Sequence, residues 1–112
     1  MQFHVTFRNL AVRPEVKSRA EVLFSKLDRF LDTSAEGQLV VSAEHGNAIA
    51  EVVITNRGHT HKAKHEDTEL RGAIDLVFHT IENQLRRAKD RRQDRRERGP
   101  DDTFGGSQPP AE

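Results

Sequence analysis

A run of arginines near one end of the chain carries the clearest chemistry in this sequence. The stretch "RRAKDRRQDRRER", residues 86–98, holds eight basic and three acidic residues, a net charge of +5. Because the whole chain is formally neutral, all other residues together carry −5. Arginine dominates the run, and its planar fork of donors suits phosphate better than a single ammonium group does. The basic residues are Arg86, Arg87, Lys89, Arg91, Arg92, Arg95, Arg96 and Arg98.

These charges also have a purely structural interpretation. Arg86 and Asp90, and likewise Arg91 and Asp94, have the i,i+4 or i,i+3 spacing that braces a solvated helix. Basic residues near a helix C-terminus also suit the helix dipole. However, five positive charges remain even if every acid in the run is paired. The surplus favours a polyanionic partner, most commonly nucleic acid, and its spread around most of the helix favours contact with backbone phosphates over base reading.

Three histidines in "HTHKAKH" have the spacing of a possible metal site. His59, His61 and His65 fall on one side of a strand, and a His-x-His pair there can hold zinc or copper. No carboxylate completes the set, because Glu66 has the opposite parity, and a fourth ligand would have to come from a distant histidine. We therefore expect no metal and interpret the histidines as polar strand residues lying under helices or on RNA, with metal binding as the open alternative.

Lys62 and Lys64 occupy the other side of the same strand. They are candidates for phosphate contacts. The alternative is that they protect an edge strand from pairing with another chain.

The sequence disfavours an enzyme. It has no cysteine, which excludes disulfides, thiolate catalysis and cysteine-based zinc sites. Its serines lack a visible base and orienting group, and no glycine-rich phosphate loop follows a strand. The acidic group Glu66, Asp67 and Glu69 suits the start of a helix. We expect no catalytic residue, no cofactor and no small-molecule substrate.

The elements that must position the basic run follow from hydrophobic periodicity. Alternation and β-branched residues predict strands, and apolar residues at helical spacing predict helices. A Gly-Asn turn signal in "HGN" predicts a hairpin between the second and third strands. The second helix is expected to start at Asp67, a good N-cap, and its apolar stripe fades after Ala88, so its last two turns should project past the sheet. The predicted strands cover residues 2–7, 38–44, 48–56 and 59–66, and the helices residues 14–31 and 67–96.

The order β-α-β-β-β-α predicts an α+β two-layer domain, with two helices on one face of a four-stranded mixed sheet. A right-handed crossover should make the first two strands parallel, and the later pairs should be antiparallel. The domain is expected to span residues 1–98. The segment 99–112, acidic and rich in Gly and Pro, is expected to be a disordered tail.

Composition sets the remaining bounds. With 112 residues, 34% hydrophobic and 32% charged, the chain suits one soluble domain with a modest core. It shows no apolar run that would span a membrane and no signal-peptide pattern, so a cytoplasmic protein is the default expectation.

An ordered series of motifs resembles the ribosome hibernation promoting factor family, also called protein Y. The motifs are "MQFHVTF", "SKLDRF", "KHED", "LRGAID" and "IENQLRRAKD", and the likeness covers roughly residues 1–95. The resemblance implies a non-catalytic stress or stationary-phase factor that binds the small ribosomal subunit, and intact ribosomes, across the mRNA channel and the A and P tRNA sites. It also implies that translation is inhibited while the ribosome hibernates.

The resemblance also implies rRNA contacts from both helices. Lys26 and Arg29 match the basic positions of the first-helix motif, and Arg86, Arg87, Lys89 and Arg91 match the basic end of the second helix. Arg92, Arg95 and Arg96 rest on charge alone. The chain departs from the family pattern at Arg71, where an aromatic residue often stands, and at Thr80 and Asn83, where many relatives are basic.

We interpret the chain as a short form that is a monomer off the ribosome. The alternatives are a general RNA- or DNA-binding module without ribosome preference, and an adaptor whose charged helix docks on an acidic protein. Whether ribosomes are paired or held singly stays open.

Overall fold

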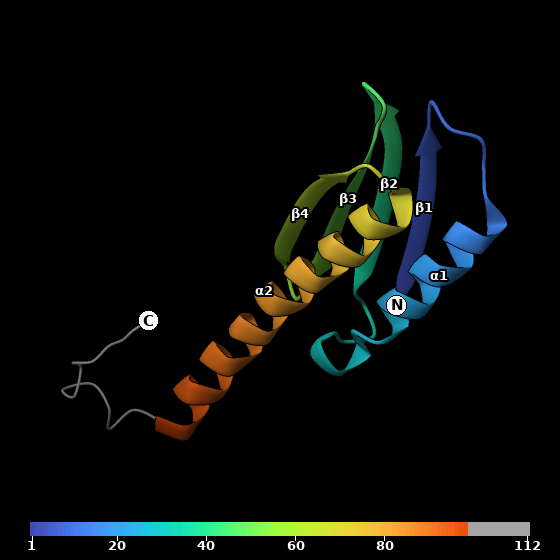
Figure 1. Ribbon diagram of the computed structural model, residues 1–112. Helices are drawn as coiled ribbons and strands as arrows, with labels where there is room; N and C mark the ends of the chain where they lie inside the picture. Colours follow the sequence, from blue (N-terminus) through green and yellow to red (C-terminus); the bar gives the residue numbers. More distant parts are fainter. Residues whose placement is uncertain (99–112) are drawn as a thin grey trace.

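The computed structural model describes the backbone of residues 1–98 and the side chains of residues 1–91. The expected tail, residues 99–112, lies outside the described residues. The elements follow the predicted order, with one additional short 3-10 helix, η1 (Figure 1). They are β1 (Gln2–Arg8), α1 (Pro14–Ser25), η1 (Asp28–Phe30), β2 (Glu36–Glu44), β3 (Asn47–Asn56), β4 (His59–Asp67) and α2 (Leu70–Arg98).

The sheet confirms the predicted α+β topology. Its strand order is β1-β2-β3-β4, with β1 and β2 parallel and the other two pairs antiparallel. Two hairpin turns set the antiparallel register: His45-Gly46 and Arg57-Gly58 all have positive φ angles between 54° and 81°. Positive φ at both central residues is the requirement of a type I′ turn, whose twist matches that of the strands.

Both helices pack on one face of the sheet, and the core lies between the two layers (Figure 1). One row of paired strand residues, Val5, Leu39, Val52 and Ala63, crosses the face that the helices cover. Position 37 in β2 favours glycine, because a Cβ there would lie 2.6 Å from Cε1 of Phe24 and the ring would have to shift. The most completely buried large side chains are Leu39, Ile54, Ile74, Ile81, Val41, Val52 and Val77.

The first helix ends earlier than predicted. We expected one helix to continue to Leu31, but α1 ends at Ser25 and the chain forms the separate turn η1. The tighter turn buries Leu27 and Phe30 together, and Leu31 is already extended. Apolar spacing alone cannot separate these arrangements, because both bury the same residues.

A buried amide fixes the chain after η1. Asn56, at the end of β3, is the one buried polar residue in the described part of the chain. Its Nδ2 donates to the Phe30 carbonyl at 3.3 Å, and its Oδ1 accepts the Asp32 N–H at 3.1 Å. The amide therefore satisfies two backbone groups of the loop and ties that loop to the sheet.

The long helix α2 has 29 residues and starts at Leu70. The predicted start at Asp67 is wrong: Asp67 ends β4, and its carboxylate accepts the Thr68 N–H at 2.6 Å. The C-terminal part of α2 projects beyond the sheet, as predicted (Figure 1). None of the helices within residues 1–98 has the length and apolar content that a membrane crossing needs.

Candidate nucleic-acid interface

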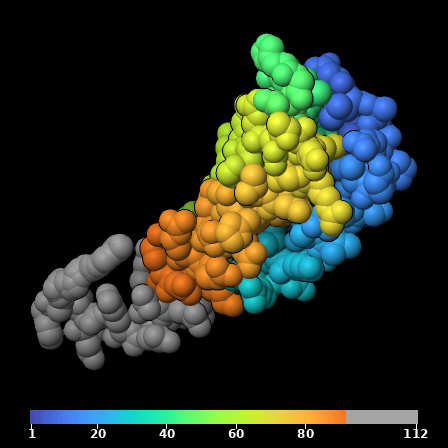
Figure 2. All heavy atoms as spheres, viewed as in Figure 1, coloured from blue at the N-terminus to red at the C-terminus, as the bar shows by residue number. Residues whose placement is uncertain are grey.

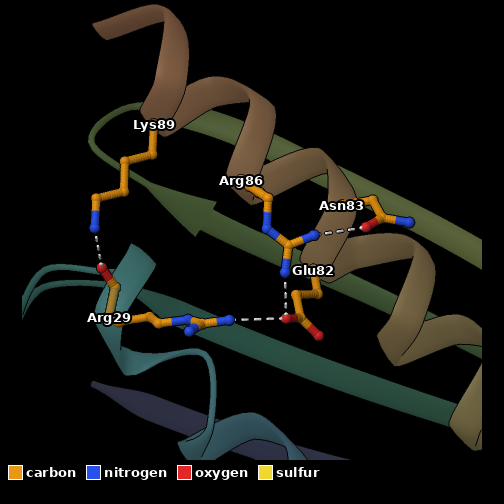
Figure 3. Close-up of polar contacts among 5 residues, drawn as sticks. All are labelled: Arg29, Glu82, Asn83, Arg86 and Lys89. Atoms are coloured by element: carbon orange, nitrogen blue, oxygen red, sulfur yellow. Dashed lines mark hydrogen bonds and ion pairs between the residues drawn. The ribbon is translucent and has the colours of Figure 1, made fainter. Parts of the chain in front are cut away.

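Basic side chains from η1 and α2 meet where α2 leaves the sheet (Figure 3). Arg29 comes from η1, whereas Arg86 and Lys89 come from α2, where they share one face with Glu82 at i,i+4 and i,i+7 spacing. We call Arg29, Glu82, Arg86 and Lys89 the basic cluster. Its three cations and one carboxylate leave a net charge of +2.

Glu82 is the centre of the basic cluster. Its Oε2 accepts Nη2 of Arg29 at 3.1 Å and Nη2 of Arg86 at 2.9 Å. Arg86 also donates to Oδ1 of Asn83 at 3.1 Å, and Lys89 donates to the Arg29 carbonyl at 3.3 Å. These bonds hold both arginine side chains in place. Because each guanidinium has five N–H donors, most of the donors are still available. The cluster is therefore preorganised for an anion with several acceptor oxygens, such as a phosphate.

The ring of Phe30 lies beneath these cations. The Cζ atoms of Arg29 and Arg86 lie 4.7 and 5.9 Å from the ring centroid, and Nζ of Lys89 lies 5.7 Å from it. Contacts of this kind attract the cations to the aromatic face. Because Phe30 is buried, its ring positions the cations instead of offering a surface on which a base could stack.

The basic residues predicted on α2 divide between two flanks. Arg87 and Arg91 are exposed and share a face with Gln84, at i+3 and i+7. Gln84 donates to the Lys62 carbonyl of β4 at 2.8 Å, which places this face on the β4 side of α2. The helix therefore presents cations along two flanks, with Arg86 and Lys89 on the side of α1 and η1.

Other predicted residues lie away from the basic cluster. Lys26 is the C-cap of α1 and lines a groove between α1 and α2. Lys62 and Lys64 are exposed on the sheet face opposite the helices, where Lys64 pairs in register with Glu51. Their contact with RNA stays a prediction. The side chains of Arg92, Arg95 and Arg96 lie outside the described residues.

Two of the three histidines of β4 lie on the side of the sheet that the helices cover, and His59 is exposed. His61 and His65 pair in register with Ile54 and Ala50, on the side that the helices cover. The Nε2 atom of His65 lies 2.7 Å from Oγ1 of Thr80 on α2, as expected for polar strand residues under a helix. In the part of the chain that the structure describes, no three His, Asp or Glu side chains are placed to hold a metal ion.

Sequence reasoning missed Glu82, Phe30, Arg19 and Asp75. Glu82 and Arg86 have i,i+4 spacing, a signal that the sequence does contain. The pairing of Arg19 on α1 with Asp75 on α2, at 2.8 Å, joins residues 56 positions apart, and spacing cannot reveal it.

Comparison with known proteins identifies the family of this chain. A curated ribosome hibernation promoting factor from Klebsiella oxytoca is 28% identical over 91 residues, covering 81% of this chain and 96% of that protein. The N-terminal domain of Thermus thermophilus protein Y has a TM-score of 0.72 at 27% identity, covering 78% of this chain and 98% of that structure. A ribosomal subunit interface protein from Coxiella burnetii shares the fold, with a TM-score of 0.66 at 20% identity, covering 80% of this chain and 99% of that structure. The family profile described as "Sigma 54 modulation protein / S30EA ribosomal protein" matches residues 3–93, and the chain therefore belongs to this family.

Proposed function

We propose that this protein is a non-catalytic, cytoplasmic factor that binds the small ribosomal subunit and inhibits translation during hibernation. It occupies the decoding region, across the mRNA channel and the A and P tRNA sites, and excludes their normal ligands. Off the ribosome it is a monomer. The curated relative named as a ribosome hibernation promoting factor supports this function, because the match covers 96% of that protein.

The basic cluster is the observation that carries the proposal. Arg29 and Arg86 converge from two elements on one carboxylate, and Lys89 completes the set, so three cations have a fixed geometry before any ligand arrives. Such a cluster suits the closely spaced phosphates of folded RNA better than a flexible tail does. Lys26 extends the cationic surface toward α1. Arg87 and Arg91 extend it along α2, and Arg92, Arg95 and Arg96 would continue it.

A general RNA- or DNA-binding module is the second candidate. The two cationic flanks of α2 favour it, because charges on several sides of a helix suit a phosphate backbone of any sequence. Lys62 and Lys64 would serve this function from the other face of the molecule. The two candidates differ in their preference for the assembled subunit over free RNA.

Sedimentation separates the two candidates. The purified protein is centrifuged with small subunits, with intact ribosomes and with naked rRNA at one near-physiological salt concentration. We expect one protein per small subunit or ribosome, and we expect release when mRNA and tRNA fill the decoding sites. Equal or tighter binding to naked RNA, without competition by tRNA, would establish the general module instead.

A matched pair of variants tests the surface that binds. Replacing Arg29, Arg86 and Lys89 with alanine should strongly reduce the amount of protein in the ribosome pellet. Replacing Lys62 and Lys64, which lie on the opposite face, should change sedimentation much less.

A further inference from the structure

A groove between α1 and α2 lies beside the basic cluster. The two helices lie side by side on the face of the molecule in view in Figure 2. Leu23, Leu27 and Phe78 form the apolar part of the groove lining, and its volume is about 180 Å³. Sites for drug-sized ligands begin at roughly 300 Å³, so this groove suits one ring system and not a larger molecule.

Arg19 supplies a fixed planar group at the groove. Its Nε and Nη2 donate to Oδ1 of Asp75 at 3.0 and 2.8 Å, which holds the guanidinium in one orientation. The Arg19 side chain is still 37% exposed. Arg19 lines the groove, and unpaired bases in RNA stack on guanidinium planes as well as on aromatic rings.

Two carboxylates in the groove lining have acceptor capacity left over. Oδ1 of Asp75 accepts both bonds from Arg19, and Oε2 of Glu82 accepts both bonds from Arg29 and Arg86. The other oxygen of each carboxylate, Oδ2 and Oε1, has no hydrogen-bond partner among the residues that the structure describes. Both side chains are partly exposed, so these oxygens are available to a ligand that donates amino N–H groups.

We propose that this groove receives one unpaired nucleobase that carries an exocyclic amino group, with cytosine as the best match. The base stacks on Arg19, and its amino group donates to the free oxygen of Asp75, the pairing that carboxylates make with N4 of cytosine. Because Glu82 belongs both to the groove and to the basic cluster, the phosphates next to that base lie on Arg29, Arg86 and Lys89. This inference rests on the proposed function, to which it adds selectivity for a base.

Neither a phosphate nor a metal ion fits the groove as well. The free carboxylate oxygens would repel a phosphate. Both carboxylates are already paired with arginines, and among the side chains that the structure describes, those of residues 1–91, no group of three is placed to hold a metal ion. An apolar floor with acceptors at the rim is instead the combination that a flat base with N–H donors requires.

Two single-stranded RNA decamers, oligo(C) and oligo(U), test the proposal directly. They have equal charge and ring size, but cytosine presents an amino donor where uracil presents a carbonyl acceptor. Fluorescence anisotropy at one salt concentration should show about tenfold tighter binding of oligo(C), the factor expected for one hydrogen bond to a charged acceptor.

Three variants assign the effect to the groove. Asp75→Asn keeps an oxygen for Arg19 but turns the free oxygen into an NH₂ donor, so the preference for oligo(C) should vanish or reverse. Arg19→Lys keeps the charge but loses the plane, and should weaken oligo(C) binding about tenfold. Arg8→Lys, at an exposed position at the end of β1, is the matched control and should bind as wild type does.

The outcomes separate this inference from the proposed function. Equal affinity for the two decamers, or equal behaviour of the Arg19→Lys and Arg8→Lys variants, would overturn the base-binding groove even if the protein sediments with small subunits. A base preference that depends on Asp75, in a protein that does not bind small subunits, would support the groove and overturn the decoding-region function.

Discussion

The basic cluster allows a quantitative expectation for the salt dependence of RNA binding. The change is the triple variant Arg29→Ala, Arg86→Ala and Lys89→Ala. If each of these cations neutralises one phosphate, binding releases the counterions of three phosphates. The slope of log K against log salt should then become shallower by about 2 to 3 units, at about 0.7 to 0.9 per phosphate.

That slope difference translates into a measurable change of affinity. Between 50 and 200 mM salt, wild-type protein should lose roughly 20- to 40-fold more affinity than the triple variant does. Equilibrium binding to small subunits at four or five salt concentrations measures both slopes. The variant should stay folded, because it removes exposed ion pairs, each of which contributes about 1 kcal/mol or less. Denaturant unfolding checks this point.

A variant that replaces cations by alanine on the opposite face of the molecule is the control. Lys62→Ala with Lys64→Ala removes two cations from the open face of the sheet. If η1 and α2 form the interface, its slope should match that of wild type, whereas a shallower slope would support the prediction that Lys62 and Lys64 contact RNA. If the triple variant kept the wild-type slope while this double variant lowered it, the phosphates would lie on the sheet face, and the assignment of the interface to η1 and α2 would be refuted.

Three further expectations follow from single positions. Glu82→Gln removes the negative charge that holds two guanidiniums, so binding to naked RNA should tighten while the preference for small subunits decreases. An unchanged ratio between the affinity for small subunits and the affinity for naked RNA would contradict the role given to this carboxylate. Gly37→Ala places a Cβ 2.6 Å from Phe24, and overpacking of this kind should lower the free energy of unfolding by about 1 to 3 kcal/mol, measured with urea. The pKa of Asp32 is lowered, chiefly because its carboxylate accepts hydrogen bonds from the side chain and the backbone of Ser34. Because the pKa of Asp32 in the folded protein is below the ordinary value of 3.8, the ionised carboxylate stabilises the fold at pH values above 3.8. This contribution is lost as the pH falls below 3.8. The free energy of unfolding of Asp32→Asn should therefore change less with pH over that acidic range than that of wild type.

Much of the fold was predictable because its elements are locally consistent. Alternation in β1 and β-branched runs in β2 and β3 indicated strands, and the chain order then implied one parallel and two antiparallel pairs, as the structure confirms. The errors lie at element ends. The start of α2 at Leu70 and the break after Ser25 depend on turns that bury residues through tertiary contacts, which spacing alone does not encode.

The candidate site was predictable only in part. The sequence identified the basic residues of α2 and the pair Lys26 and Arg29, but it could not state which of them share a surface. The structure brings Arg29 to Arg86 and Lys89 and places Lys62 and Lys64 on the opposite face. Residues separated by a single position on a strand, or by one step of 100° on a helix, project in different directions.

By itself, the sequence determined the β-α-β-β-β-α order, the alternation that marks β1 as a strand and the concentration of positive charge toward the end of α2. These properties arise from periodicity and charge along the chain, which act locally. Only the tertiary structure decided that Glu82 joins η1 to α2, that Phe30 lies under three cations and that Arg19 and Asp75 meet across a groove. The contacts that α2 makes with α1 and η1 join residues 53 to 60 positions apart, and they form only when both helices pack against the same sheet.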